Sequence, residues 1–212
     1  MKNNQYNKVL IIGKSEKFIK EIKKNYTFKK LDIIPWRQIH FYLGKKLIKY
    51  NLVFICGFDF STYLKNRKTF ERKNIFEIIY LLRKIANRQT MLIYINTQKT
   101  NNKNYTFSRY RYAKQKLAYL IFKKFKNCLI FNSDLIKVNE DVSINSNLFS
   151  KLIFYFFSKF NLIKTIDIKK LFSKIKNMLY LKDFPKQQNI KGLFITIPRT
   201  QLIDRFLRLI LG

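Results

Sequence analysis

The chain has 212 residues and is 47% hydrophobic, which excludes a disordered protein and suits one domain with a sizeable core. No apolar run reaches the ~18 residues of a transmembrane helix, and the run before Gly13 is too short for a signal peptide, so we expect a cytoplasmic protein. The net charge of +32 indicates an anionic partner such as nucleic acid or a membrane surface, but AT-rich codons that favour lysine over glycine explain it equally well.

Five short apolar runs are typical of strands that are buried on both faces. The first run ends at Gly13, and Ser15 then stands at the expected N-cap of a helix with apolar residues at helical spacing. Strongly periodic segments at 71–87 and 104–122 predict two further helices between later strands. The predicted strands begin at Lys8, Lys30, Asn51, Met91 and Asn127.

Apolar strands that alternate with amphipathic helices predict an α/β fold, a doubly wound parallel sheet of the Rossmann-like kind. Such sheets bind ligands at the carboxyl ends of their strands. Gly13, Gly57 and Thr97 all stand at those ends, so we expect them to converge on one crevice.

The C-terminal third has a less regular pattern. It predicts a helix at 148–160, a short extended piece followed by a helix capped by Asp167, a strand at 192–197 and a terminal helix from Thr200. We expect a single domain over residues 1–212, in which 1–135 form the core sheet and 136–212 form a small irregular lobe on the substrate side.

The helix at 104–122 contains two tyrosine–lysine pairs at i, i+4 spacing, Tyr110 with Lys114 and Tyr112 with Lys116. Residues at this spacing lie on one helical face. An ammonium beside a phenol lowers the pKa of the phenol, which can then exchange protons near neutral pH. The alternative is a half-buried tyrosine beside a solvated lysine. Thr97 ends the preceding strand, where its hydroxyl could orient a substrate oxygen.

In ordered pieces over nearly its whole length, the chain resembles the extended short-chain dehydrogenase/reductase superfamily, the NAD(P)-dependent epimerase/dehydratase family. The segments "VLIIGKSEKFIKEI", "LVFICG", "FERKNIFEIIYLL", "LIYINT" and "YRYAKQKLAYLI" follow the order of the family's motifs. The resemblance implies catalytic roles for Thr97, Tyr110 and Lys114, with Tyr110 as the general acid/base. The small Ala113 before Lys114 favours this pair over Tyr112 with Lys116.

The resemblance also implies a site for NAD or NADP. Its residues would be Gly13, Lys14, Ser15, Arg37, Gly57, Asn74 and Lys114. In this set Asn74 is the family's structural asparagine, Lys114 bonds the nicotinamide ribose, and Arg37 favours a 2′-phosphate.

The phosphate loop departs from the family's three-glycine pattern. Only Gly13 is present, while Glu16 and Ile19 stand where the second and third glycines would be. Glu16 would place a side chain and a negative charge near two phosphates, with Lys14 and Lys17 close enough to offset it. Phe131–Asn132 replaces the family's arginine–proline. We therefore expect dinucleotide binding that is weak or lost.

Two functions stay open. The first is an NAD(P)-dependent epimerase, dehydratase or reductase that acts on a nucleotide-linked sugar, in surface polysaccharide synthesis. The second is a catalytically degenerate Rossmann-fold binding or scaffold protein, whose basic surface contacts nucleic acid, a ribonucleoprotein or an anionic membrane. The sequence leaves the choice between monomer and homodimer open.

Metal chemistry has little support in the sequence. Cys56 and Cys128 are the only cysteines, and each lies in an apolar run typical of a buried free thiol. His40 is the only histidine, so no cluster has the spacing of a zinc site, and we assign no metal ligand.

Overall fold

A computed structural model describes residues 5–13, 15–62, 65–97, 108–133, 135–138, 141–142, 165–180 and 193–196. Its main feature is a six-stranded sheet in the order β2-β1-β3-β4-β5-β9, in which every neighbouring pair is parallel. The strands are β1 (Gln5–Ile12), β2 (Thr27–Ile34), β3 (Leu52–Ile55), β4 (Met91–Thr97), β5 (Cys128–Ser133) and β9 (Leu193–Thr196).

The five strands predicted at the N-terminal side are confirmed, with ends that differ by up to three residues. The late strand predicted at 192–197 is also confirmed, and it extends the sheet at the β5 edge. The predicted α/β, doubly wound parallel fold is therefore correct.

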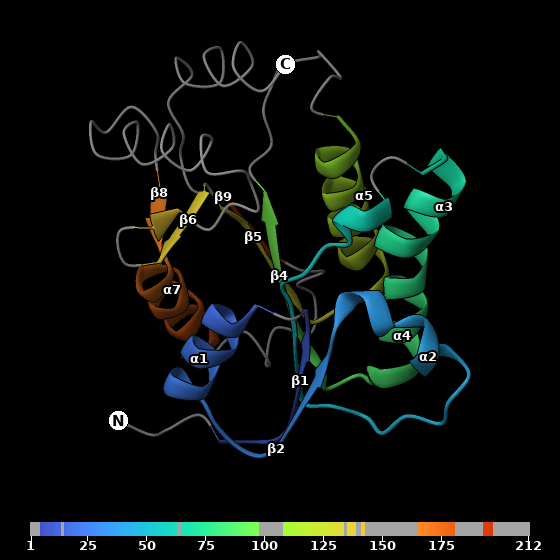
Figure 1. Ribbon diagram of the computed structural model, residues 1–212. Helices are drawn as coiled ribbons and strands as arrows, with labels where there is room; N and C mark the ends of the chain where they lie inside the picture. Colours follow the sequence, from blue (N-terminus) through green and yellow to red (C-terminus); the bar gives the residue numbers. More distant parts are fainter. Residues whose placement is uncertain are drawn as a thin grey trace.

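Helices cover both faces of the sheet (Figure 1). On one face lie α1 (Glu16–Asn25) and α7 (Ile168–Tyr180), which contact each other. On the other face lie α2 (His40–Leu43), α3 (Arg67–Glu71), α4 (Glu77–Ile85) and α5 (Ser108–Lys124), together with short 3-10 turns η1 (Trp36–Gln38) and η2 (Phe60–Thr62).

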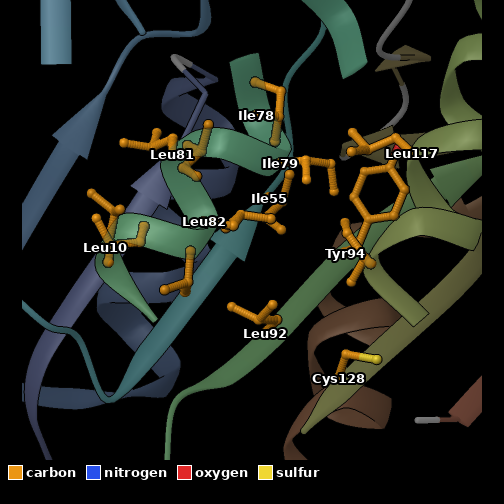
Figure 2. Close-up of a cluster of buried hydrophobic side chains, with 14 of the residues drawn as sticks. Leu10, Ile55, Ile78, Ile79, Leu81, Leu82, Leu92, Tyr94, Leu117 and Cys128 are labelled. Carbon is orange, nitrogen blue, oxygen red and sulfur yellow. The ribbon is translucent and has the colours of Figure 1, made fainter. Parts of the chain in front are cut away.

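The two faces of the sheet bury separate hydrophobic clusters, because successive side chains of a strand point to opposite sides. In β3, Val53 and Ile55 belong to the cluster under α4 and α5, while Leu52 and Phe54 belong to the cluster under α1 and α7. Figure 2 shows the first cluster, in which side chains from α4 and α5 meet side chains from the strands: Leu10, Ile55, Ile78, Ile79, Leu81, Leu82, Leu92, Tyr94, Leu117 and Cys128.

The helix predicted at 71–87 begins earlier and contains an irregular turn. Asn66 caps α3 by accepting a hydrogen bond from the Thr69 amide at 2.8 Å, so the helix starts at Arg67. A π-helical turn, η3 (Arg72–Phe76), then joins α3 to α4. Such turns often occur at functional positions, and this one carries Asn74.

The described C-terminal segments form a second, three-stranded sheet in the order β7-β6-β8, with β6 (Leu135–Val138), β7 (Asp141–Val142) and β8 (Thr165–Asp167). The Asp167 carboxylate accepts a hydrogen bond from the Lys169 amide at 2.7 Å, which confirms the predicted cap of α7. The helices predicted at 148–160 and from Thr200 lie outside the described residues.

Two further predictions concern the whole chain. Cys56 and Cys128 are free thiols, with Cys128 buried and Cys56 partly buried. Among the helices that the structure describes, none is long and apolar enough to cross a membrane.

Candidate functional site

The carboxyl ends of β1, β2 and β3 approach one another at Gly13. Its amide donates to the Ile34 carbonyl at 2.9 Å, and its φ of 137° is a conformation that side-chain-bearing residues rarely adopt. A Cβ at Gly13 would lie 3.1 Å from the Gly57 nitrogen. The structure therefore brings Gly13 and Gly57 together as predicted, and both the backbone angle and the close approach require glycine at position 13.

Trp36, which the sequence analysis did not single out, covers Gly57. A Cβ added to Gly57 would lie 2.4 Å from the indole Cε3, so the aromatic ring rests directly on the glycine. The Trp36 side chain is only 6% exposed and belongs to the cluster under α4 and α5. Its signal in the sequence is that the only tryptophan follows Pro35 directly after the second strand, whose last residue Ile34 is buried.

Arg37, predicted to favour a 2′-phosphate, contacts a carboxylate instead of standing alone. Its Nε donates to Asp59 Oδ1 at 3.2 Å, although most of the arginine side chain is exposed. The same Asp59 oxygen accepts from the Ser61 hydroxyl at 2.6 Å and from the Ser61 amide at 3.0 Å. Asp59 is buried, so the loop after β3 already supplies a charged partner to Arg37.

Asn74 holds that same loop to the π-helical turn. Its side-chain oxygen accepts from the Asp59 amide at 2.8 Å, and its amide group donates to the Thr62 hydroxyl at 2.9 Å and to the Phe70 carbonyl at 3.3 Å. Asn74 is 1% exposed. These contacts are those of a structural asparagine that fixes the loop between β3 and α3.

The start of α1 lacks part of what a phosphate site needs. Ser15 occupies the N-cap position, but its side chain makes no capping hydrogen bond. Glu16 is the first residue of the helix and places a negative charge in the first turn, where anions are otherwise stabilised. Ile19 packs against the cluster under α1 and α7. Lys14 lies outside the described residues.

Lys114 is a buried amine near the carboxyl ends of β3 and β4. Its Nζ donates to the Ile95 carbonyl at 2.6 Å and lies 4.6 Å from the centre of the Tyr94 ring. Burial lowers the pKa of Lys114 to about 7, while its interaction with Cys56 opposes that change. Burial raises the pKa of Cys56 to about 12. Lys114 therefore loses its proton near neutral pH, whereas Cys56 stays a protonated thiol.

Tyr110 lies half-buried in the first turn of α5. Its ring stacks on Phe60 with centroids 5.3 Å apart and meets Phe58 edge-on at 4.7 Å. Burial raises the pKa of Tyr110 to about 12, and the neighbouring Arg111 opposes this only in part. The predicted lowering of the tyrosine pKa by Lys114 is therefore wrong for this structure, because the ammonium bonds the Ile95 carbonyl and burial dominates at the phenol.

The remaining predicted catalytic residue, Thr97, is the last residue of β4 and pairs in register with Ser133. This confirms its place at the carboxyl end of a strand, but its side chain lies outside the described part of the structure. The roles of Thr97, Tyr110 and Lys114 stay predictions.

The second pair, Tyr112 with Lys116, makes the direct contact that the first pair lacks. The Lys116 ammonium donates to the Tyr112 hydroxyl at 2.7 Å and to Glu71 Oε2 at 2.9 Å. Arg67 completes the group through Glu71 Oε1 at 2.7 Å. Tyr112 is 36% exposed, and its hydroxyl lies within 3.4 Å of the Arg67 guanidinium on α3.

Comparison with known proteins places the fold. In sequence, the chain matches no family model and no curated protein. In structure, it is similar to the enzyme WbmF from Bordetella bronchiseptica, solved with NAD+, at a TM-score of 0.58 and 9% identity over 93% of this chain and 76% of that one. It is also similar to a short-chain dehydrogenase from Streptomyces avermitilis, at a TM-score of 0.56 and 13% identity over 97% and 92%.

A third similar structure is a dTDP-4-dehydrorhamnose reductase from Clostridium acetobutylicum, at a TM-score of 0.54 and 14% identity over 96% of this chain and 80% of that one. At these identities the likeness establishes the fold, which is the one shared by short-chain dehydrogenases and NAD(P)-dependent epimerases and dehydratases. Of the three, the Bordetella enzyme was solved in complex with NAD+.

The residues of this chain do not fit a dinucleotide bound against Gly57. In this fold a ligand reaches the backbone at the carboxyl ends of the strands, where small residues leave room for it. Here the indole of Trp36 occupies the space over Gly57, Glu16 places a carboxylate in the first turn of α1, and Arg37 contacts Asp59.

Proposed function

We propose that this chain is a Rossmann-fold binding protein that acts through its basic surface and no longer turns over a nicotinamide dinucleotide. The observation that carries the proposal is the contact of Trp36 with Gly57. The partner is polyanionic, because the chain has a net charge of +32. Codon bias and an anionic partner both account for this charge from sequence alone. Here we attribute the charge to a partner in the cytoplasm.

Opening the crevice would be costly. Trp36 packs in the same cluster as Ile34 and Ile39, and removing a buried tryptophan from a core destabilises a protein by about 3–5 kcal/mol. A dinucleotide that required the indole to leave would lose a comparable part of its binding energy. Weak affinity is therefore expected even where the other contacts are made.

The electrostatics at the helix start act in the same direction. At about 4 Å, a carboxylate and a phosphate repel each other by about 1 kcal/mol in water and by several times more in a partly buried site. We expect Glu16→Gly to strengthen dinucleotide binding about tenfold, because it removes this repulsion and lets the backbone approach the phosphates.

The test is a titration of wild type, Glu16→Gly, Trp36→Leu and the double variant with NADH and NADPH at fixed ionic strength. Tripolyphosphate controls for binding through charge alone. Phe172→Leu, which changes a buried aromatic residue on the opposite face, controls for loss of stability. We expect wild type to bind NADH no more tightly than tripolyphosphate, and the double variant to bind it best. Micromolar binding of NADH by wild type would overturn the proposal.

A second candidate function is favoured by Lys114. Within the described part of the chain, the buried Lys114 amine pairs with a carbonyl and with no carboxylate. Such an amine lowers stability, and the residue is more readily retained for chemistry than for packing. In this alternative, Tyr110, Lys114 and Thr97 serve an NAD(P)-dependent epimerase, dehydratase or reductase acting on a nucleotide-linked sugar in polysaccharide synthesis.

This alternative is tested by turnover of dTDP-linked keto sugars with NADH or NADPH. If it holds, Tyr110→Phe lowers turnover at least 100-fold, because a positioned acid/base contributes about 10²- to 10⁴-fold. Tyr112→Phe is the matched control on the same helix and should leave turnover unchanged. Absence of turnover in wild type, with either cofactor, leaves the binding function as the one supported.

A further inference from the structure

The outer side of α4 and α5 carries exposed aromatic rings in two stripes. Phe76 and Tyr80 lie one turn apart at the start of α4, and Tyr112 and Tyr119 lie two turns apart on α5. Their side chains are between 36% and 56% exposed. Four exposed aromatic rings on two adjacent helices call for an explanation, because exposed apolar groups that gather in one region mark interaction sites.

Each of these rings has a lysine ammonium close to it. Lys84 lies 5.1 Å from the centre of the Tyr80 ring, and Lys123 lies 6.0 Å from the centre of the Tyr119 ring. We call the four rings and their lysines, Phe76, Tyr80, Tyr112, Tyr119, Lys84, Lys116 and Lys123, the aromatic–lysine face.

Lys116 joins the two stripes. Its Nζ lies 5.4 Å from the centre of the Phe76 ring and 5.1 Å from that of Tyr112, so rings from both helices lie around one ammonium. The aromatic–lysine face is therefore continuous across the α4–α5 contact, which Figure 1 shows on the side of the sheet opposite to α1 and α7.

The charge of this face is strongly positive. The α5 segment contains several lysines and arginines and no acidic residue. The acids nearest the face are already paired, Glu71 with Arg67 and Lys116, and Glu77 with Lys73 at 3.1 Å. Of the other lysines of the face, Lys84 also donates to the Leu43 carbonyl, whereas Lys123 lies in the last turn of α5 and is the lysine best placed to reach an anionic partner.

We propose that the aromatic–lysine face binds single-stranded nucleic acid. This inference rests on the proposed function and names its partner. Exposed rings offer stacking platforms to unpaired bases, and lysines beside them reach the phosphates, which is the combination that sequence-tolerant single-strand binding requires. A base that stacks on the Tyr119 ring displaces the Lys123 ammonium, which then contacts the adjoining phosphate.

A single strand fits this face better than other occupants. A second copy of the chain would bring two molecules of charge +32 together, which opposes association. A phospholipid surface supplies negative charge but no planar group to stack on separated tyrosine rings. Double-stranded nucleic acid keeps its bases stacked within the helix and unavailable to these rings.

The test measures the affinity of the full chain for a fluorescent single-stranded oligonucleotide of mixed sequence, by anisotropy at several salt concentrations. We expect the double variant Tyr80→Ala/Tyr119→Ala to bind at least tenfold more weakly, since stacking on one ring is worth about a factor of ten. Tyr80→Phe/Tyr119→Phe keeps the rings and should bind like wild type. Lys123→Gln should reduce the slope of affinity against salt by about one phosphate contact.

Several results would overturn the inference while leaving the proposed function intact. These are equal affinity of the alanine and wild-type chains for the oligonucleotide, tighter binding to phosphatidylserine vesicles than to the oligonucleotide, or a dimer that the alanine variant converts to a monomer. Failure of the proposed function has a different signature, which is tight binding of NADH in the titration above.

Discussion

Two tyrosine–lysine pairs of equal spacing lie on α5, two residues apart, and they differ in almost every physical property. Tyr110 with Lys114 faces the sheet, where Lys114 is 5% exposed. Tyr112 with Lys116 faces outward, next to Glu71 and the rings of the aromatic–lysine face. A shift of two residues rotates a helical side chain by about 200°, so equal spacing leads to opposite environments.

The inner pair is separated by competing partners. The ammonium of Lys114 bonds the Ile95 carbonyl, and the ring of Tyr110 packs against Phe58 and Phe60. Burial lowers the pKa of Lys114 to about 7 and raises the pKa of Tyr110 to about 12, because it disfavours the charged form of each group.

The outer pair is joined. Hydrogen bonds with Tyr112 and Glu71 raise the pKa of Lys116 above its ordinary value, and together they outweigh the opposing effect of burial. The comparison teaches that an i, i+4 tyrosine–lysine pair identifies neither a lowered tyrosine pKa nor a catalytic site. The partners around the pair decide both.

The largest expected effect is that of Lys114→Met on stability. The pKa of Lys114 is about 7 in the folded chain and 10.5 ordinarily, so between these values the unfolded chain binds more protons and stability rises with pH. At pH 7 and below, the buried amine lowers the free energy of unfolding by up to about 5 kcal/mol, since a tenfold change in proton affinity is about 1.4 kcal/mol. Lys114→Met also loses the hydrogen bond to the Ile95 carbonyl, so we expect it to raise the free energy of unfolding by about 2–4 kcal/mol at pH 7.

This prediction is checked by urea unfolding at pH 7 and pH 9, two values within the range over which Lys114 contributes a pH-dependent stability. Wild type should be more stable at pH 9 than at pH 7, and Lys114→Met should lose most of that difference. Lys116→Met is the matched control, because its amine is partly exposed and its pKa is raised. Equal pH dependence in the two variants would show that Lys114 is not a neutralised buried amine.

Much of the fold was predictable because burial is recorded in the pattern of apolar residues. Runs such as Leu52–Ile55 are buried on both faces, and only a parallel sheet covered by helices uses such runs repeatedly. The π-helical turn around Asn74 was not predictable, because it depends on hydrogen bonds to Asp59 and Thr62, which are distant in sequence.

The candidate site was predictable in position but less so in environment. Gly13, Gly57 and Thr97 do stand at strand ends, since element boundaries determine that. The indole over Gly57 and the Ile95 carbonyl at Lys114 are tertiary contacts, and no local pattern specifies them.

The next effect in size belongs to Glu71, which holds the outer pair. Burial alone would raise the pKa of Glu71, but hydrogen bonds from Arg67 and Lys116 outweigh burial and lower it. Its stabilising contribution is therefore present above the ordinary carboxyl pKa and is lost as pH falls through the folded value. We expect Glu71→Gln to lower the free energy of unfolding by about 1–2 kcal/mol at pH 7.

Unfolding of Glu71→Gln at pH 7 and at pH 3 measures this contribution. At pH 3 the difference from wild type should shrink, because pH 3 lies below the ordinary carboxyl pKa and protonation of the unfolded wild-type carboxylate then opposes folding. A difference that stays constant across this range would mean that packing, rather than the ion pairs, accounts for the effect.

A smaller effect is expected for Tyr94→Phe beneath the inner pair. The Tyr94 hydroxyl donates to the Lys114 carbonyl at 3.2 Å, and the ring lies under the Lys114 ammonium. The variant loses one buried hydrogen bond, about 1 kcal/mol, but keeps the ring. Thermal unfolding gives the loss of stability, and NMR titration of the lysine side chains should find the pKa of Lys114 almost unchanged.

The smallest effect on stability, and the sharpest on the comparison, is that of Tyr112→Phe. The variant removes a hydroxyl that accepts from Lys116 at 2.7 Å and from Arg67 at 3.4 Å, both at an exposed position. Exposed contacts of this kind contribute at most about 0.5–1 kcal/mol, so unfolding should change little. The pKa of Lys116 should nevertheless fall toward its ordinary value, because its bond to Tyr112 is lost and only Glu71 continues to raise it.

NMR titration of the lysine side chains in Tyr112→Phe and Tyr110→Phe compares the two pairs directly. Tyr110→Phe should leave the pKa of Lys114 unchanged, since that ammonium bonds the Ile95 carbonyl. A change at Lys114 without a change at Lys116 would reverse the assignment and make Tyr110 with Lys114 the coupled, catalytically relevant pair.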